Sequence, residues 1–96
     1  MTSIELIILN KLGLHARAAA KFIAIANQFQ CNITLKKLDT DGTNDPQEVN
    51  GKSIMALLIL AAHQGTRLLL STDGEDENEA AQAIKELVEH YFDEDE

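Results

Sequence analysis

The sequence has little cysteine, no excess of basic charge and no long apolar run. Its one cysteine, Cys31, cannot form a disulfide within the chain, so nothing here calls for an oxidising compartment. The longest apolar stretch, residues 54–62, is far shorter than the ~20 residues that cross a bilayer. Residues 1–5 are too polar for a secretion signal. We therefore expect a cytoplasmic protein that does not insert into membranes.

Basic residues are outnumbered by acidic ones, eight against sixteen, which gives a net charge of −8. A chain of this sign is repelled by the phosphates of nucleic acids and by anionic lipid surfaces, so neither is expected as a partner. Eleven of the acidic residues lie in residues 73–96, which hold one lysine. A solvated helix face and a frayed tail over residues 93–96 account for this concentration without an acidic function.

Length and composition fit one small globular domain spanning residues 1–96. The chain weighs 10.6 kDa and is 45% hydrophobic, which argues against disorder. Alternating or β-branched apolar runs predict strands, and apolar residues spaced by three and four predict helices. Strands are expected at residues 4–9, 32–38, 47–49 and 66–72, helices at 16–29, 54–64 and 76–91, and a turn-rich loop at 39–46.

The predicted order is β-α-β-β-α-β-α. In one domain it places three helices on one side of a mostly antiparallel four-stranded sheet, an α+β fold. Gly65 should close the second helix, and Asp76 with Glu79 should form a capping box at the start of the third. The free face of the sheet should carry the polar side chains of the strands: Thr34, Lys36, Glu48 and Arg67.

Signatures of most reactive sites are missing. The sequence has no G-x-S-x-G motif and no phosphate-binding P-loop. The three histidines, His15, His63 and His90, fall in different elements without metal-ligand spacing. Cys31 fits a small, partly buried residue opening a strand better than a catalytic thiol. We expect no metal site and no cofactor.

One short stretch, from Gly13 to Arg17, carries candidate chemistry. Glycine bends the chain, His15 stands at the start of a helix, and Arg17 follows two residues later. A helix N-terminus has unpaired N–H groups and a partial positive charge, which attract an anion and favour a neutral, nucleophilic imidazole. If His15 attacked a phosphoryl donor, the phosphate would lie over the amides of Ala16 and Arg17, and the guanidinium could bind its oxygens.

The second predicted helix is apolar on all sides from residue 54 to 62. A helix that covers one side of a sheet needs only one apolar stripe. Leu57, Leu60, Ala61 and Gln64 fall on one face, and Met55, Leu58, Ile59 and Ala62 on the other. The surplus indicates deep burial, a homodimer or a docking surface, and methionine suits a surface that repacks against several partners.

Three motifs carry a resemblance to a known family. Residues 11–17 (KLGLHAR), 51–55 (GKSIM) and 64–66 (QGT) occur in this order on the predicted elements. Together they resemble the HPr family of phosphocarrier proteins of the bacterial phosphoenolpyruvate phosphotransferase system. The resemblance covers essentially the whole chain and implies that family's open-faced β-sandwich.

The resemblance also implies a function. A phosphoryl group would pass from phosphorylated enzyme I to Nδ1 of His15, assisted by Arg17, and then to an enzyme IIA protein. Such a protein is a carrier and not an enzyme, and we expect a monomer. Ser53 matches the position that a serine kinase phosphorylates in some members, although capping the second helix is a sufficient role for it. The residues expected to face partners are Ile54, Met55 and Ile59.

The run after His15 has Ala18 where many members have proline, which is more similar to the nitrogen-related branch, NPr. That branch implies a regulatory enzyme IIA as the recipient. Two alternatives stay open: a sugar-transport HPr, and an interaction module of the same fold in which His15 has no role in transfer.

Overall fold

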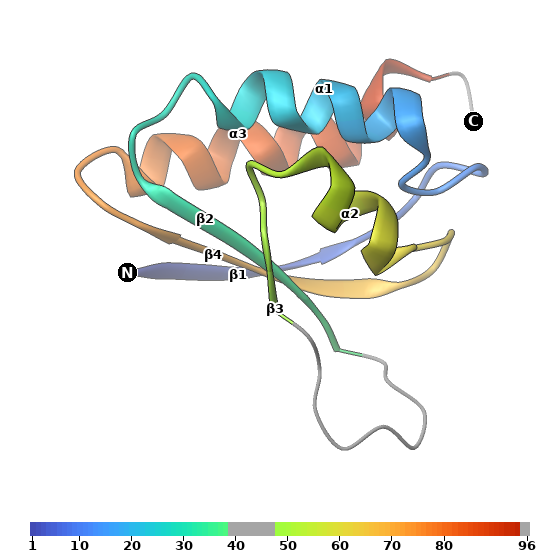
Figure 1. Ribbon diagram of the computed structural model, residues 1–96, viewed down its shortest axis with the longest axis horizontal. Helices are drawn as coiled ribbons and strands as arrows, with labels where there is room; N and C mark the ends of the chain where they lie inside the picture. Colours follow the sequence, from blue (N-terminus) through green and yellow to red (C-terminus); the bar gives the residue numbers. More distant parts are fainter. Residues whose placement is uncertain (39–47, 95–96) are drawn as a thin grey trace.

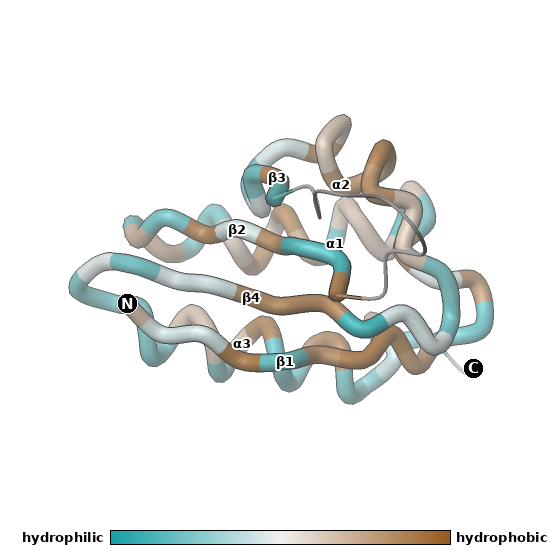
Figure 2. The backbone as a smooth tube through the Cα atoms, turned by 90° about the horizontal axis from the view of Figure 1, so that it is seen from below, coloured by the Kyte–Doolittle hydropathy of each residue, from teal (hydrophilic) through white to brown (hydrophobic). Residues whose placement is uncertain are grey.

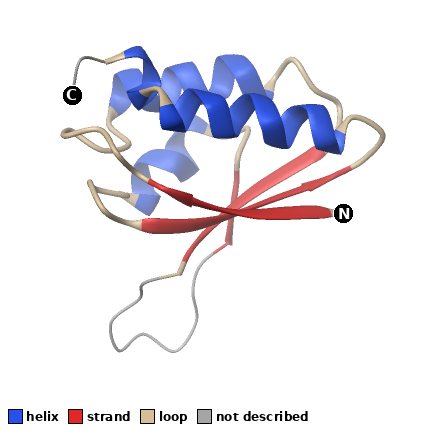
Figure 3. Cartoon of the chain, turned by 180° about the vertical axis from the view of Figure 1, so that it is seen from behind, coloured by secondary structure: helices blue, strands red, loops and turns tan. Residues whose placement is uncertain are grey.

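The computed structural model of the protein describes residues 1–38 and 48–94. In this part of the chain, one antiparallel sheet contains β1 (Thr2–Ile7), β2 (Asn32–Lys37), β3 (Glu48–Asn50) and β4 (Arg67–Asp73), in the order β1-β4-β2-β3. The helices α1 (Ala16–Ala26), α2 (Ile54–Leu60) and α3 (Glu77–Glu89) lie on one side of it, as Figures 1 and 3 show. The predicted α+β fold and element order are confirmed; the loop expected at residues 39–46 lies outside the described residues.

Alternation along the strands produces a sheet with one buried and one open face. Leu70 of β4 is fully buried and stands opposite Leu35 of β2 in the register. The next residue, Ser71, points the other way and stands opposite Thr34 of β2 and Ser3 of β1. Figure 2 looks onto this open face. As predicted, the polar residues named for it are exposed or half-buried: Thr34, Lys36, Glu48 and Arg67.

Small residues on α1 and α3 let these helices pack closely over the sheet. Ala18 and Ala19 of α1 and Ala80 of α3 are buried, and the two helices are in contact. Phe22 of α1 is also buried and belongs to the same hydrophobic core. Cys31 is buried just before β2, consistent with the structural role expected for it.

The end of α2 differs from the sequence prediction. The helix ends at Leu60 and not at residue 64, because Ala61 adopts a left-handed conformation (φ 52°) that caps it. Ala62 then turns inward and is buried, while Ala61 and Gln64 are exposed, so the faces predicted beyond residue 60 were wrong. The reason is a contact distant in sequence: the carbonyl of Ala62 accepts a hydrogen bond from the N–H of Leu14 at 2.8 Å.

The capping box predicted for α3 is also wrong. Asp76 precedes the helix but makes no side-chain cap, and Glu79 is exposed. The Asp76 carboxylate accepts instead from the N–H groups of Gln30 and Cys31, at 2.8 and 3.0 Å. These bonds, the one to Gln30 first, hold the pKa of Asp76 below its ordinary value against a smaller opposing effect of burial. Asp76 therefore ties the start of α3 to the connection between α1 and β2.

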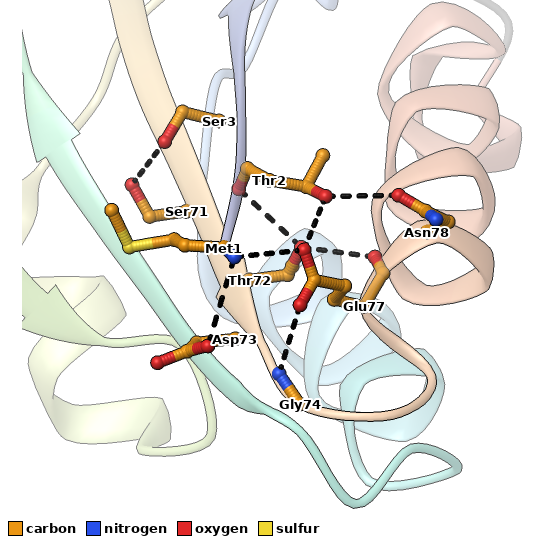
Figure 4. A network of polar contacts seen from close by, with 9 residues as sticks. All are labelled: Met1, Thr2, Ser3, Ser71, Thr72, Asp73, Gly74, Glu77 and Asn78. Carbon is orange, nitrogen blue, oxygen red and sulfur yellow. Dashed lines mark hydrogen bonds and ion pairs between the residues drawn. The ribbon is translucent and has the colours of Figure 1, made fainter.

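Glu77 anchors the same end of the molecule to the N-terminus (Figure 4). Its Oε2 accepts from the Thr2 hydroxyl at 2.6 Å and lies 3.1 Å from the amino group of Met1, and its Oε1 accepts from the N–H of Gly74 at 3.3 Å. The backbone carbonyl of Glu77 accepts from the Thr72 hydroxyl at 2.9 Å. β1, β4 and α3 are thus joined by polar contacts at this end.

The segment after α3 is ordered where a frayed tail was expected. The helix ends at Glu89, and Tyr91, Phe92 and Asp93 form the short turn η1 (Tyr91–Asp93), each with a positive φ of 53–61°. The Phe92 side chain is completely buried, whereas Tyr91, where the predicted third helix was expected to end, is exposed. Burial of Phe92 folds the chain back toward the start of α1, at the same end of the molecule (Figures 1 and 3). Of the expected tail, residues 95 and 96 lie outside the described residues.

Candidate functional site

The loop before α1 is held in place by the end of α2. Gly13 has a φ of +71°, and a Cβ atom at this position would lie 2.6 Å from the carbonyl oxygen of Ala62. Any side chain would therefore clash with backbone as well as strain the turn. The next residue, Leu14, is buried and donates its N–H to the same carbonyl. Glycine at this position allows the loop to adopt the turn that places His15 at the start of α1.

His15 is the N-cap of α1 rather than its first residue. Its backbone is extended (φ −83°, ψ −179°), and its Nδ1 accepts the N–H of Arg17 at 3.2 Å. This is the capping bond that Ser or Asp normally supplies. Because a backbone N–H can only donate, Nδ1 presents a lone pair, and the ring proton is on Nε2. The side chain is 27% exposed, which leaves it accessible from one side.

Ala16 and Arg17 occupy the first turn of α1, and both are exposed. The first N–H groups of a helix have no partner within it, and the helix dipole adds partial positive charge. An anion beside Nδ1 would meet these amides and the guanidinium of Arg17. The three residues predicted as a site are thus adjacent, and the arrangement can hold a phosphoryl group on the imidazole.

Sequence reasoning missed two further residues, Glu94 and Asn10. Glu94 Oε2 lies 2.5 Å from Nε2 of His15, and Glu94 Oε1 accepts from the side-chain amide of Asn10 at 3.0 Å. Asn10 is fully buried, and its amide also donates to the carbonyl of Gly13 at 2.8 Å. The available signal was weak: Phe92, a large apolar residue in an acidic tail, marks the point where the chain turns inward.

Glu94 carries a negative charge at this site. Burial raises the pKa of its carboxyl, but the hydrogen bonds from Asn10 and His15, with the nearby charge of Arg17, outweigh burial and hold this pKa below its ordinary value. The side chain is 12% exposed. An anionic acceptor thus faces the Nε2 edge of the ring, while the helix start faces the Nδ1 edge.

The outer face of α2 is an exposed apolar surface. Ile54, Met55 and Ile59 are 40%, 64% and 69% exposed, as expected, while Leu57 and Leu60 on the inner face are buried. Figure 2 shows this hydrophobic helix projecting beyond β3. Leu58 on the same helix is 36% exposed, and Leu12, in the loop before α1, is 69% exposed; neither was predicted as a docking residue.

Ser53 begins α2 as its N-cap. Its backbone is extended, and its Oγ accepts the N–H of Ala56 at 3.3 Å. The side chain is half-buried. The capping role expected of this serine is confirmed, and the hydroxyl stands at the edge of the exposed apolar face.

Residues 1–38 and 48–94 contain no group of three or more His, Cys, Asp or Glu side chains arranged to hold a metal ion. The helices in the same residues include none with the length and apolar character to cross a membrane.

Comparison with known proteins identifies the family. The family model described as "PTS HPr component phosphorylation site" matches residues 2–90. The phosphocarrier protein HPr of Pseudomonas aeruginosa is 49% identical over 96 residues, covering all of both chains. The phosphocarrier protein NPr of Proteus mirabilis is 39% identical over 86 residues, covering 90% of this chain and 89% of the relative. The crystal structure of HPr from Thermoanaerobacter tengcongensis superimposes with a TM-score of 0.86 at 38% identity, over all of both chains. Family match, fold and relatives agree: the chain belongs to the HPr family of phosphocarrier proteins of the phosphotransferase system.

Proposed function

We propose that His15 is the residue that carries the phosphoryl group, accepting it on Nδ1 from phosphorylated enzyme I and giving it to an enzyme IIA. One observation carries this assignment. Nδ1 presents its lone pair at the N-terminus of α1, where it accepts the Arg17 N–H. A nucleophile placed there holds its product over a site suited to an anion.

In the accepting step, the Nδ1 lone pair forms a bond to phosphorus while the bond between phosphorus and the leaving atom of the donor breaks. The electron pair of the broken bond leaves with the donor. The Arg17 N–H, which bonds to Nδ1 beforehand, is then free to donate to a phosphoryl oxygen, as is that of Ala16. Transfer to enzyme IIA runs the same step in the opposite direction. The protein needs both partners and turns over no substrate of its own.

The exposed face of α2 supplies the docking surface in this proposal. Ile54, Met55 and Ile59 lie outward on a helix that contacts α1 directly. A partner seated on these residues would therefore meet α1 as well. Apolar exposure of this kind on a small protein is typical of an interaction site. We propose a cytoplasmic monomer that acts as one domain and binds its partners in turn.

Ser53 is proposed as a regulatory position. A phosphate on its Oγ would stay near the start of α2, where the helix end tolerates negative charge. It would also add about −2 of charge beside Ile54 and Met55. Desolvating that charge would weaken docking of an acidic or apolar partner surface.

The transfer proposal is tested by incubating the protein with phosphoenolpyruvate and enzyme I. We expect one phosphate per chain, labile in acid and stable in base, and none on His15→Ala. The matched control is His90→Ala, which removes an exposed histidine at the other end of the chain and should label fully. Full labelling of His15→Ala would refute the proposal.

The recipient is tested in the same system. Phosphorylated protein is mixed with a sugar-type and a nitrogen-type enzyme IIA, and the rates of transfer are compared. The residues after His15 predict faster transfer to the nitrogen type. The interaction-module alternative, favoured by the exposed α2 face, predicts instead that His15→Ala still binds and regulates its partner as the native protein does.

A further inference from the structure

The tail turn η1 is held against the site from two sides. Phe92 is fully buried, and the Lys21 ammonium donates to the Phe92 carbonyl at 2.8 Å. Three consecutive non-glycine residues with positive φ are unfavourable, because the side chain crowds the backbone in a left-handed conformation. The turn persists because these contacts fix it, and backbone strain of this kind concentrates at functional sites.

The turn places the Glu94 carboxylate between two partners. One oxygen meets Nε2 of His15 at 2.5 Å, and the other accepts from the amide of Asn10 at 3.0 Å. Asn10 is buried, and its amide nitrogen also donates to the Gly13 carbonyl. A 180° flip of the amide would place its oxygen against two acceptors, the Gly13 carbonyl and the Glu94 carboxylate. A fixed buried amide thus aims the carboxylate at the ring.

Each edge of the His15 ring then has one defined role. Nδ1 accepts from the Arg17 N–H, which requires a lone pair there, and Nε2–H donates to Glu94. When Nδ1 takes a phosphoryl group, no proton leaves the ring, so the imidazole gains one positive charge. A carboxylate bonded to Nε2–H stabilises that charge, as the aspartate does for the histidine in serine hydrolases.

We infer that Glu94, held by Asn10, is a positioning residue for phosphoryl transfer: it keeps the proton on Nε2, leaves Nδ1 free to attack, and stabilises the imidazolium formed as the nitrogen–phosphorus bond forms. The inference rests on the proposed role of His15. Glu94 lies beyond residues 2–90, the segment matched by the family model.

The test replaces Glu94 by glutamine, which keeps the size of the side chain and removes its charge. Asp93→Asn is the matched control, because it removes one exposed charge from the same turn. Two quantities are measured on each protein: the rate of phosphorylation by enzyme I, and the nitrogen-15 chemical shifts of the His15 ring with the water exchange of Nε2–H.

In the native protein and in Asp93→Asn we expect Nε2 protonated, Nδ1 unprotonated and slow exchange of Nε2–H. In Glu94→Gln we expect a mixture of the two ring tautomers and faster exchange of Nε2–H. The rate of phosphorylation should fall by roughly tenfold or more, since the carboxylate that orients the histidine of serine hydrolases contributes at least this much.

Two results overturn the inference. One is a Glu94→Gln protein that is phosphorylated at the native rate or whose His15 ring keeps its native nitrogen-15 shifts. A slower rate with unchanged ring shifts would mean that Glu94 acts on docking and not on the imidazole. The other is an equal change in Asp93→Asn, which would mean that tail charge in general is responsible. Failure of the proposed role of His15 gives a different result, because the His15→Ala protein would then be phosphorylated whether residue 94 is Glu or Gln.

Discussion

Replacing Met55 by glutamate separates a docking surface from a hydrophobic core on a single helix. Met55 is 64% exposed on α2, whereas Leu57, two residues later, is fully buried. A surface substitution away from buried partners changes the free energy of unfolding by less than about 0.5 kcal/mol. Met55→Glu should therefore fold with native stability, and glutamate near a helix N-terminus is favourable.

The effect on binding should be large by comparison. Burying a methionine side chain contributes about 1.5–3 kcal/mol, and roughly two thirds of this one is available to a partner. Losing about 1–2 kcal/mol weakens affinity by about tenfold, and the new charge must in addition be desolvated. Leu57→Ala, the matched control, should cost about 2–5 kcal/mol of stability, which lowers the melting temperature of a chain of this size by roughly 10–40 °C.

The assay combines thermal unfolding with enzyme I binding by calorimetry. We expect Met55→Glu to unfold at the same temperature as the native protein and to bind enzyme I at least about tenfold more weakly. Leu57→Ala should unfold at a much lower temperature. A Met55→Glu protein that melts as early as Leu57→Ala would show that Met55 belongs to the core. Native binding by Met55→Glu would remove α2 from the docking surface.

Two further predictions concern the helix starts. Ser53→Asp should be phosphorylated by enzyme I more slowly than Ser53→Ala, because its charge lies beside the apolar face of α2; equal rates in a labelling time course would remove Ser53 from regulation. Asp76 has its pKa depressed in the folded state, so its contribution to stability is present above pH ~4 and is lost as the pH falls through the folded value. In urea unfolding at pH 7, the Asp76→Asn protein should have a lower free energy of unfolding than the native protein, and this difference should become smaller toward pH 3. A difference that does not change with pH would contradict this.

The fold was predictable because its information is local. Alternating strands, helical spacing of apolar residues and turn residues predicted the element order, and Gly13 to Arg17 predicted an anion-binding helix start. Those features depend on neighbours in the sequence, and the structure places His15, Ala16 and Arg17 together as expected.

What the sequence did not predict depends on contacts between distant residues. α2 ends early because the Ala62 carbonyl accepts a hydrogen bond from Leu14, 48 positions away. The Asp76 carboxylate accepts from the N–H groups of Gln30 and Cys31 and does not cap α3. Glu94 reaches His15 across 79 positions. No periodicity reports such pairs, and a run of acidic residues at a chain end is more often solvated than placed beside a nucleophile.

The location of the phosphorus atom tests the central claim most directly. Protein labelled with nitrogen-15 in its histidines is phosphorylated with enzyme I and phosphoenolpyruvate, and the phosphorus-31 to nitrogen-15 coupling is measured. We expect one phosphorus bonded to Nδ1 of His15, with Nε2 of the same ring still facing Glu94. Coupling to Nε2 of His15, or to a nitrogen of His63 or His90, would contradict it.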